Sequence, residues 1–183
     1  MQKQPKIVLF IGAPSTGKTS VLNYLIDIGY CCFEEISRQV VQEARKEGYQ
    51  HLFKNKPLLF SKKLLEGRKN QFSRAQKQEK TFVFIDRGLP DITAYLDMVN
   101  TAYPQEFIEA NIDHRYDCVF WFPLWRDIHI FDDERYEDFE LSQNIENHLI
   151  NSYNTLGYDL IEVPKHAVED RVKFILSHLE HNA

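Results

Sequence analysis

Short runs of consecutive apolar residues alternate along this chain with longer stretches in which apolar residues recur every three or four positions. A continuous apolar run is typical of a parallel strand buried on both faces, and the longer spacing is typical of a helix with one buried face. The stretch from 167 to 181, for example, carries Val168, Val172, Ile175 and Leu179 on one stripe. The pattern predicts five strands, near residues 7–11, 30–33, 81–85, 118–122 and 158–163.

The alternation of strands with helical stretches favours an α/β fold with a doubly wound parallel sheet, because parallel neighbours need right-handed crossover connections. The sequence has no internal repeat or low-complexity tract, and residues 48–56 are expected to form a polar loop. We therefore expect one domain over residues 1–183. Predicted helices follow the first strand as far as residue 28 and then cover about 34–46, 58–78, 90–100, 137–155 and 167–181.

The first strand leads into the pattern G-x-x-x-x-G-K-T, which identifies a P-loop when a strand precedes it and a helix follows it. Two glycines allow backbone conformations closed to other residues, so successive N–H groups can converge on a polyphosphate. Lys18 would reach the β- and γ-phosphates, and the Thr19 hydroxyl would bind Mg²⁺. A chance match in a glycine-containing turn is the alternative. The predicted nucleotide-binding residues are Gly12, Ala13, Pro14, Ser15, Thr16, Gly17, Lys18, Thr19 and Ser20.

Asp86 stands at the carboxyl end of the third predicted strand, where open α/β sheets bind their ligands. A carboxylate at this position can hold Mg²⁺ or accept a proton from an attacking hydroxyl. The next residue is Arg87, whereas hydrolytic motors carry a glutamate there to activate water; Asp-Arg instead looks like an element of nucleoside and nucleotide kinases. The alternative is that Asp86 only caps the helix that begins near Leu89.

Three further charged residues fall on predicted helices. Glu35 and Arg38 are spaced as neighbours on one helix, so they could line the site together. The alternative is that they form only an exposed ion pair. Arg68 shares a buried stripe with Leu65 and Phe72, so its guanidinium needs an anionic partner. That partner is either a structural carboxylate or a phosphate at the end of the sheet.

The segment after the fourth strand, about 123–136, carries Arg126 and Arg135 on either side of an acidic cluster. This arrangement suits a lid that brings a guanidinium onto a transferring phosphate. A solvated loop with exposed ion pairs is the alternative. Which arginine acts is open.

Composition narrows the function classes. The 22 basic and 27 acidic residues give a net charge of −5, which does not favour nucleic-acid binding. No apolar run is long enough to span a membrane, no signal-peptide pattern precedes the first strand, and the cysteines lack metal-ligand spacing. We expect a cytoplasmic protein.

Together these motifs resemble the AAA_28 group of small P-loop ATPases, which is related to the ribosylnicotinamide kinase domain of bifunctional NAD-biosynthesis proteins. The resemblance implies a nucleotide-kinase-like sheet ordered 2-3-1-4-5, with a lid after strand four. The group includes both metabolite kinases and regulatory nucleotide-binding proteins. The resemblance runs nearly end to end and rests on the P-loop, residues 35–38, Arg68, and residues 84–91, 132–135, 156–158, 162–164 and 169–172.

The expected function is a Mg²⁺-dependent phosphotransferase that moves the γ-phosphate of ATP to a small hydroxyl-bearing metabolite such as a nucleoside. Asp86 would orient or deprotonate the acceptor or hold the metal, and Arg126 or Arg135 would close over the γ-phosphate. The acceptor side would be lined by Glu35, Arg38, Arg68 and Arg87. A nucleotide-dependent module that recruits a protein or lipid is the alternative, and an ATPase of a toxin, phage or repair system is a third.

Overall fold

The computed structural model describes residues 4–49, 52–128 and 138–181. Strands and helices alternate along them, as predicted. Residues 48–56 are not wholly a loop, because a short helix forms there. The elements are β1 Lys6–Ile11, α1 Lys18–Asp27, β2 Cys31–Phe33, α2 Ser37–Lys46, α3 Leu52–Asn55, α4 Pro57–Gln76, β3 Phe82–Asp86, α5 Leu89–Met98, α6 Glu106–Asp113, β4 Cys118–Trp121, the 3₁₀ turn η1 Arg126–Ile128, α7 Phe139–Thr155, β5 Leu160–Glu162 and α8 Val168–His181.

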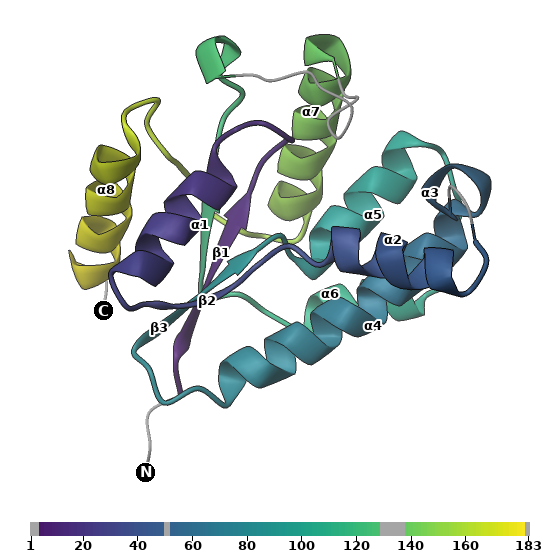
Figure 1. The fold of residues 1–183 in the computed structure, drawn as a ribbon, viewed down its shortest axis with the longest axis horizontal. Coiled ribbons are helices and arrows are strands. Elements are labelled where there is room, and N and C mark those ends of the chain that lie inside the picture. The colour runs from purple at the N-terminus through teal and green to yellow at the C-terminus, as the bar shows by residue number, and fades with distance from the viewer. Residues whose placement is uncertain (1–3, 50–51, 129–137, 182–183) are drawn as a thin grey trace.

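The five strands form one parallel sheet in the order β2-β3-β1-β4-β5, which confirms the predicted topology. The register pairs Phe10 of β1 with Asp86 of β3, and Phe33 of β2 with Ile85. The carboxyl ends of these three strands therefore meet at one edge of the sheet; in Figure 1 the strands rise toward this edge from the side of the N-terminus. Ligands of doubly wound sheets bind outside this edge.

Side chains of β1 alternate between two apolar layers, as the two-residue period of a strand requires. Val8 and Phe10 pack with α1 and α8 on one face of the sheet, whereas Ile7, Leu9 and Ile11 pack with α4 and α7 on the other (Figure 1). All five side chains are buried, which explains why this strand is apolar throughout. Helix α5 contacts both α4 and α7.

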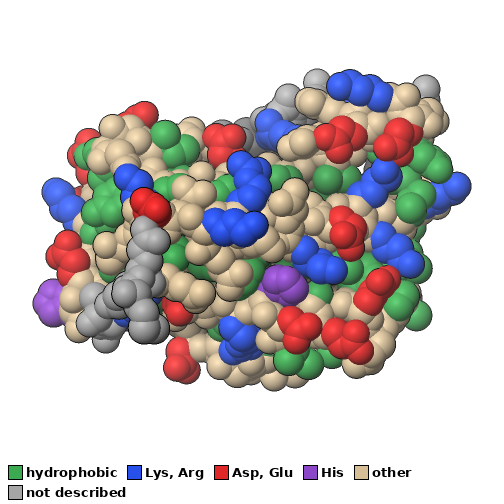
Figure 2. Space-filling view, turned by 90° about the horizontal axis from the view of Figure 1, so that it is seen from below, with side chains coloured by type: hydrophobic (Ala, Val, Ile, Leu, Met, Phe, Trp, Pro, Cys, Tyr) green, Lys and Arg blue, Asp and Glu red, His purple; other side chains and the backbone are tan. Residues whose placement is uncertain are grey.

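Figure 2 views the molecule from below and shows acidic and basic side chains interspersed over that face. This mixture agrees with the small net charge of the sequence. Among the described residues, none of the helices combines the length and apolarity that crossing a membrane requires.

Candidate functional site

The P-loop connects β1 to α1 over residues 12–17, at the carboxyl edge of the sheet. Gly12 and Gly17 have φ angles of +145° and +82°, which side chains other than glycine rarely adopt. Gly12 also lies close to the chain just after β4, since a Cβ there would be 2.5 Å from the carbonyl oxygen of Phe122. Both positions therefore require glycine because of their backbone conformation. The loop geometry favours a concave array of N–H groups at the positive end of α1.

Lys18 begins α1 and lies inside the loop rather than in solvent, with 6% of its surface exposed. Its ammonium donates hydrogen bonds to the carbonyls of Gly12 at 2.9 Å and Ala13 at 2.8 Å, and to the Thr16 hydroxyl at 3.1 Å. Burial, followed by the charge of Arg87, lowers the pKa of Lys18 to about 8. A buried ammonium held by neutral carbonyls is placed to gain from an anion in the loop.

Asp86 ends β3 beside the loop and is 3% exposed. Its Oδ1 has no hydrogen-bond partner among the described residues. Burial raises the pKa of this carboxyl above its ordinary value, although Lys18 and Arg87 act in the opposite direction. Asp86 does not cap α5, because the N-cap is Gly88, whose N–H donates to the Asp91 carboxylate at 2.9 Å.

An orphaned carboxylate oxygen beside a phosphate loop fits a divalent cation, which prefers oxygen ligands. The predicted second ligand, Thr19, is exposed in the first turn of α1, as is Ser20. No group of three or more His, Cys, Asp or Glu residues is gathered for metal binding in the part of the chain that is described. Mg²⁺ would therefore depend on nucleotide phosphates for the rest of its ligands.

A second cluster of charges lies beside Asp86. The Glu35 carboxylate bonds Arg87 Nε at 2.8 Å and Arg68 Nη2 at 3.1 Å, and Arg87 Nη1 lies 3.4 Å from Asp91. Tyr153 of α7 donates to Asp91 at 2.5 Å. Burial alone would raise the pKa of Glu35, but Arg68 and Arg87 outweigh it and hold this pKa below its ordinary value. This largely buried network joins the segments that follow β2 and β3 to α4, α5 and α7.

Arg68 therefore has a structural carboxylate as its partner, the first of the two alternatives left by the sequence. The predicted helix over 34–46 is wrong at its start, because α2 begins at Ser37 and Glu35 lies before it. The Glu35 carboxylate instead accepts from the backbone N–H of Ser37. Arg38 is exposed in the first turn of α2.

The sequence matches the model of the AAA_28 family, described as an AAA domain, over residues 7–171. The chain belongs to this family. The match begins in β1 and ends in α8, so it includes the P-loop, Asp86 and the charge network. No curated protein matches the chain in sequence.

Solved structures that resemble this AAA_28 protein include NadR and two kinases. NadR in complex with NR has a TM-score of 0.70 at 17% identity, covering 97% of this chain and 49% of NadR. Thymidylate kinase from Candida albicans gives 0.65 at 14% identity, over 98% of this chain and 92% of the enzyme. Shikimate kinase from Acinetobacter baumannii in complex with shikimate has a TM-score of 0.61 at 17% identity, covering 99% of this chain and 96% of the enzyme. These likenesses show a nucleotide-kinase fold, and the chain spans about half the length of NadR.

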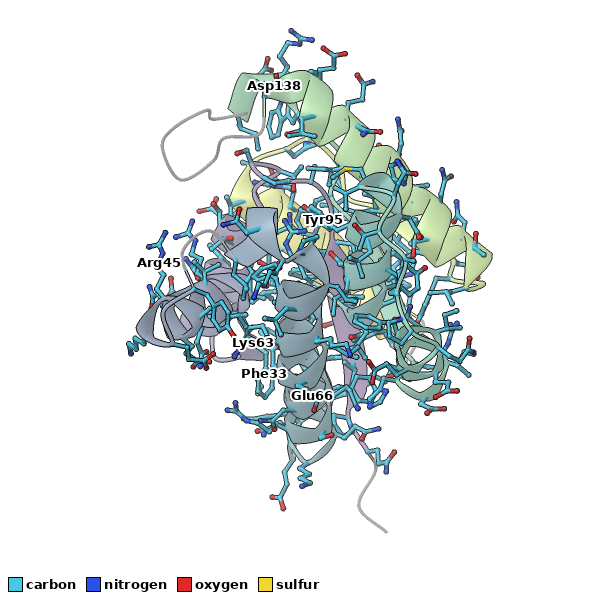
Figure 3. All side chains as sticks on the ribbon, turned by 90° about the vertical axis from the view of Figure 1, so that its right-hand side faces the viewer. Phe33, Arg45, Lys63, Glu66, Tyr95 and Asp138 are labelled. Atoms are coloured by element: carbon cyan, nitrogen blue, oxygen red, sulfur yellow. The ribbon has the colours of Figure 1, made fainter. Side chains whose placement is uncertain are left out.

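The described part of the predicted lid is short. Arg126 lies in η1, with its guanidinium 4.2 Å from the ring centre of Phe139 at the start of α7. Arg135 lies outside the described residues, as does the rest of 129–137. Figure 3 looks onto α4 and shows Tyr95 of α5 and Asp138, the N-cap of α7, in the upper part of the molecule. The guanidinium of Arg87 lies 5.9 Å from the Tyr95 ring centre.

Sequence reasoning missed three residues that the structure brings to the site. Asp91 and Tyr153 complete the charge network, and Arg171 of α8 reaches the P-loop backbone. Tyr153 continues an apolar stripe, so nothing in the sequence indicates that its hydroxyl makes a polar contact. For Arg171 the sequence did contain an indication, because the residue falls three positions after Val168 and four before Ile175, on the buried face of its helix.

Proposed function

We propose that this AAA_28 protein is a Mg²⁺-dependent phosphotransferase that moves the γ-phosphate of ATP to the hydroxyl of a small metabolite. The observation that carries this proposal is the pairing of two buried groups at one edge of the sheet. Lys18 lies inside the P-loop, and Asp86 beside it has a carboxylate oxygen to which none of the described residues donates a hydrogen bond. A cation that binds phosphate and a carboxylate for metal or hydroxyl are two recurring parts of phosphoryl-transfer sites.

On the nucleotide side, the loop N–H groups and the N-terminus of α1 would hold the phosphates. Lys18 would exchange its carbonyl partners for the β- and γ-phosphates. Thr19 and Asp86 would hold Mg²⁺, which supplies positive charge to neutralise the phosphoryl oxygens. Arg126 or Arg135 would close over the γ-phosphate as its charge spreads.

On the acceptor side, the acceptor oxygen bonds to the γ-phosphorus while the bond from that phosphorus to the β–γ bridging oxygen breaks, and ADP leaves. Asp86 orients the acceptor hydroxyl or takes its proton, and its raised pKa suits a group that accepts a proton. Glu35, Arg68 and Arg87 line this side, with Arg38 at its exposed margin.

The charge balance of the network bears on the acceptor class. Arg68 and Arg87 are already neutralised by Glu35 and Asp91, so this cluster of two cations and two anions has no net charge. A phosphorylated acceptor would require guanidinium groups free to bind its phosphate. The network therefore favours an uncharged hydroxyl acceptor such as a nucleoside over a nucleoside monophosphate.

The test is ATP consumption with Mg²⁺ across nucleosides, their 5′-monophosphates, nicotinamide riboside and shikimate. NadR is solved with NR and shikimate kinase with shikimate, which motivates the last two compounds. The expected result is one compound that raises turnover above basal hydrolysis and itself gains phosphate. Lys18→Ala and Asp86→Asn should abolish the increase, and Asp113→Asn, an exposed carboxylate of α6, should keep it.

Tight nucleotide binding without any responsive acceptor would contradict the kinase and favour the regulatory module. Full activity in Asp86→Asn together with loss in Lys18→Ala would show that Asp86 has no part in transfer. Preference for a monophosphate over its nucleoside would contradict the charge argument alone.

A further inference from the structure

Arg171 lies on the side of the P-loop that faces α8, in the first turn of that helix. The residue is 5% exposed. Its Nη1 donates a hydrogen bond to the carbonyl oxygen of Thr16 at 3.3 Å, across 155 residues of sequence. Its guanidinium carbon lies 5.9 Å from the ring centre of Trp125. Arg171 thus lies between the P-loop and the chain that leaves the fourth strand.

The charge of Arg171 has no carboxylate partner within residues 4–49, 52–128 and 138–181, and its Nε has no hydrogen-bond partner there. The other two arginines of the site, buried Arg68 and partly buried Arg87, both contact carboxylates. Among the described residues this buried guanidinium contacts a backbone carbonyl and an aromatic ring, an arrangement that is costly, and a nearby anion would reduce that cost.

The contact with Thr16 fixes a peptide plane of the loop. In a trans peptide the C=O of one residue and the N–H of the next point in opposite directions. All described peptide bonds are trans. Because Arg171 holds the Thr16 carbonyl toward α8, the Gly17 N–H points away from α8.

The Arg171 guanidinium lies very close to the Cα of Gly17. A Cβ at this position would lie 2.6 Å from Arg171 Nη1, closer than real Cβ contacts. The glycine therefore serves two purposes, its φ of +82° and the space for Arg171. A rigid planar donor group packed against the loop can hold one peptide in place more firmly than a flexible ammonium.

We propose that Arg171 is a positioning residue of the phosphate-binding loop. It orients the Thr16–Gly17 peptide so that the Gly17 N–H meets the polyphosphate, and it places a positive charge behind that peptide. The proposal rests on the proposed nucleotide binding. It makes α8, which contributes none of the predicted nucleotide contacts, a necessary part of the phosphate site.

Two readouts test this in the full chain, using Arg171→Gln, Arg171→Lys and Lys173→Gln. Lys173 is an exposed cation two residues further along α8, so it controls for charge and helix. The first readout is amide hydrogen exchange over residues 12–20 without nucleotide. The second is the Kd for Mg·ATP and for inorganic tripolyphosphate, which carries phosphates but no base.

Arg171→Gln should speed exchange in the loop and raise both Kd values by a similar factor, about tenfold, the loss expected for one charge-assisted hydrogen bond. Arg171→Lys should give intermediate values, and Lys173→Gln should match wild type. Unchanged loop exchange in a folded Arg171→Gln protein would overturn the proposal whether or not nucleotide binds. A loss for ATP but not for tripolyphosphate would overturn it too, because Arg171 would then contact the base.

Failure of the proposed function has a different signature. Wild-type protein that binds neither ATP nor tripolyphosphate would contradict nucleotide binding. Faster loop exchange in Arg171→Gln would, even then, support the positioning role of this residue, so the two failures are distinguishable.

Discussion

The hydrogen bond from Tyr153 to Asp91 anchors the charge network of Glu35, Arg68, Arg87 and Asp91 to α7. The two groups lie 62 residues apart in sequence and 2.5 Å apart in space. Burial and the nearby Asp91 charge raise the pKa of the Tyr153 hydroxyl well above its ordinary value, so it stays a donor at neutral pH. Tyr153→Phe removes this hydroxyl and keeps the buried ring.

The expected magnitude follows from burial and charge. Tyr153 is fully buried and Asp91 is 1% exposed, so water cannot replace the lost donor. A hydrogen bond to a charged group contributes about 1.5–3 kcal/mol to the free energy of unfolding. For a chain of this size each kcal/mol shifts the melting temperature by about 2–4 °C, so Tyr153→Phe should lower it by about 3–12 °C.

Tyr158→Phe is the matched control, because its hydroxyl only accepts a longer, neutral bond from the Tyr116 N–H at 3.3 Å. Denaturant unfolding followed by circular dichroism, repeated in an Asp91→Asn background, yields the coupling energy of each tyrosine with Asp91. We expect at least about 1 kcal/mol for Tyr153 and much less for Tyr158. Equal coupling energies for the two tyrosines would refute the reasoning.

Three more predictions follow from buried groups. Gly88→Ala places a methyl 2.6 Å from the Tyr153 hydroxyl and should lower the free energy of unfolding by about 1–3 kcal/mol in denaturant titrations, unlike Gly67→Ala, whose methyl meets only the flexible end of Ile36. Above about pH 8, ATP binding should be accompanied by proton uptake, because phosphate binds the charged form of Lys18. Calorimetry in buffers of different ionisation enthalpy measures this uptake, and the absence of proton uptake would contradict the prediction. Asp86→Asn should raise the melting temperature of the nucleotide-free protein at pH 8 and lose that gain in acid. Burial raises the folded-state pKa of the Asp86 carboxyl, so the stability that its protonated form contributes is lost as pH rises. A lower melting temperature of Asp86→Asn at pH 8 would contradict this.

The strands and the P-loop could be predicted because both are local. Ile7 to Ile11 form a continuous apolar run since each side chain meets a covered face of the sheet, and that burial is the same whatever element covers it. Likewise Gly12 and Gly17 adopt positive φ within one short loop, so their spacing suffices. Asp86 was placed by the same logic, as the residue at the end of a buried strand.

Partner choice was not local. Arg68 on its apolar stripe indicated a buried cation, but its partner Glu35 lies 33 residues away and is reached only because β2 and β3 are neighbours in the sheet. Helical spacing instead suggested Arg38 as the partner of Glu35, because such spacing identifies only residues close in sequence. It carries no information about which strands are neighbours in the sheet. Arg135, predicted in the lid, lies outside the described residues.

By itself, then, the sequence determined most of the strands and helices, the position and backbone conformation of the P-loop, and the burial of Arg68. These properties depend on backbone conformation and on the burial of one face, which the order of residue types sets directly. Only the tertiary structure decided that Glu35 and Asp91 neutralise the arginines, and that Arg171 of α8 holds the Thr16 carbonyl. Those contacts depend on which element ends meet in space, and that follows from the order and register of the whole sheet.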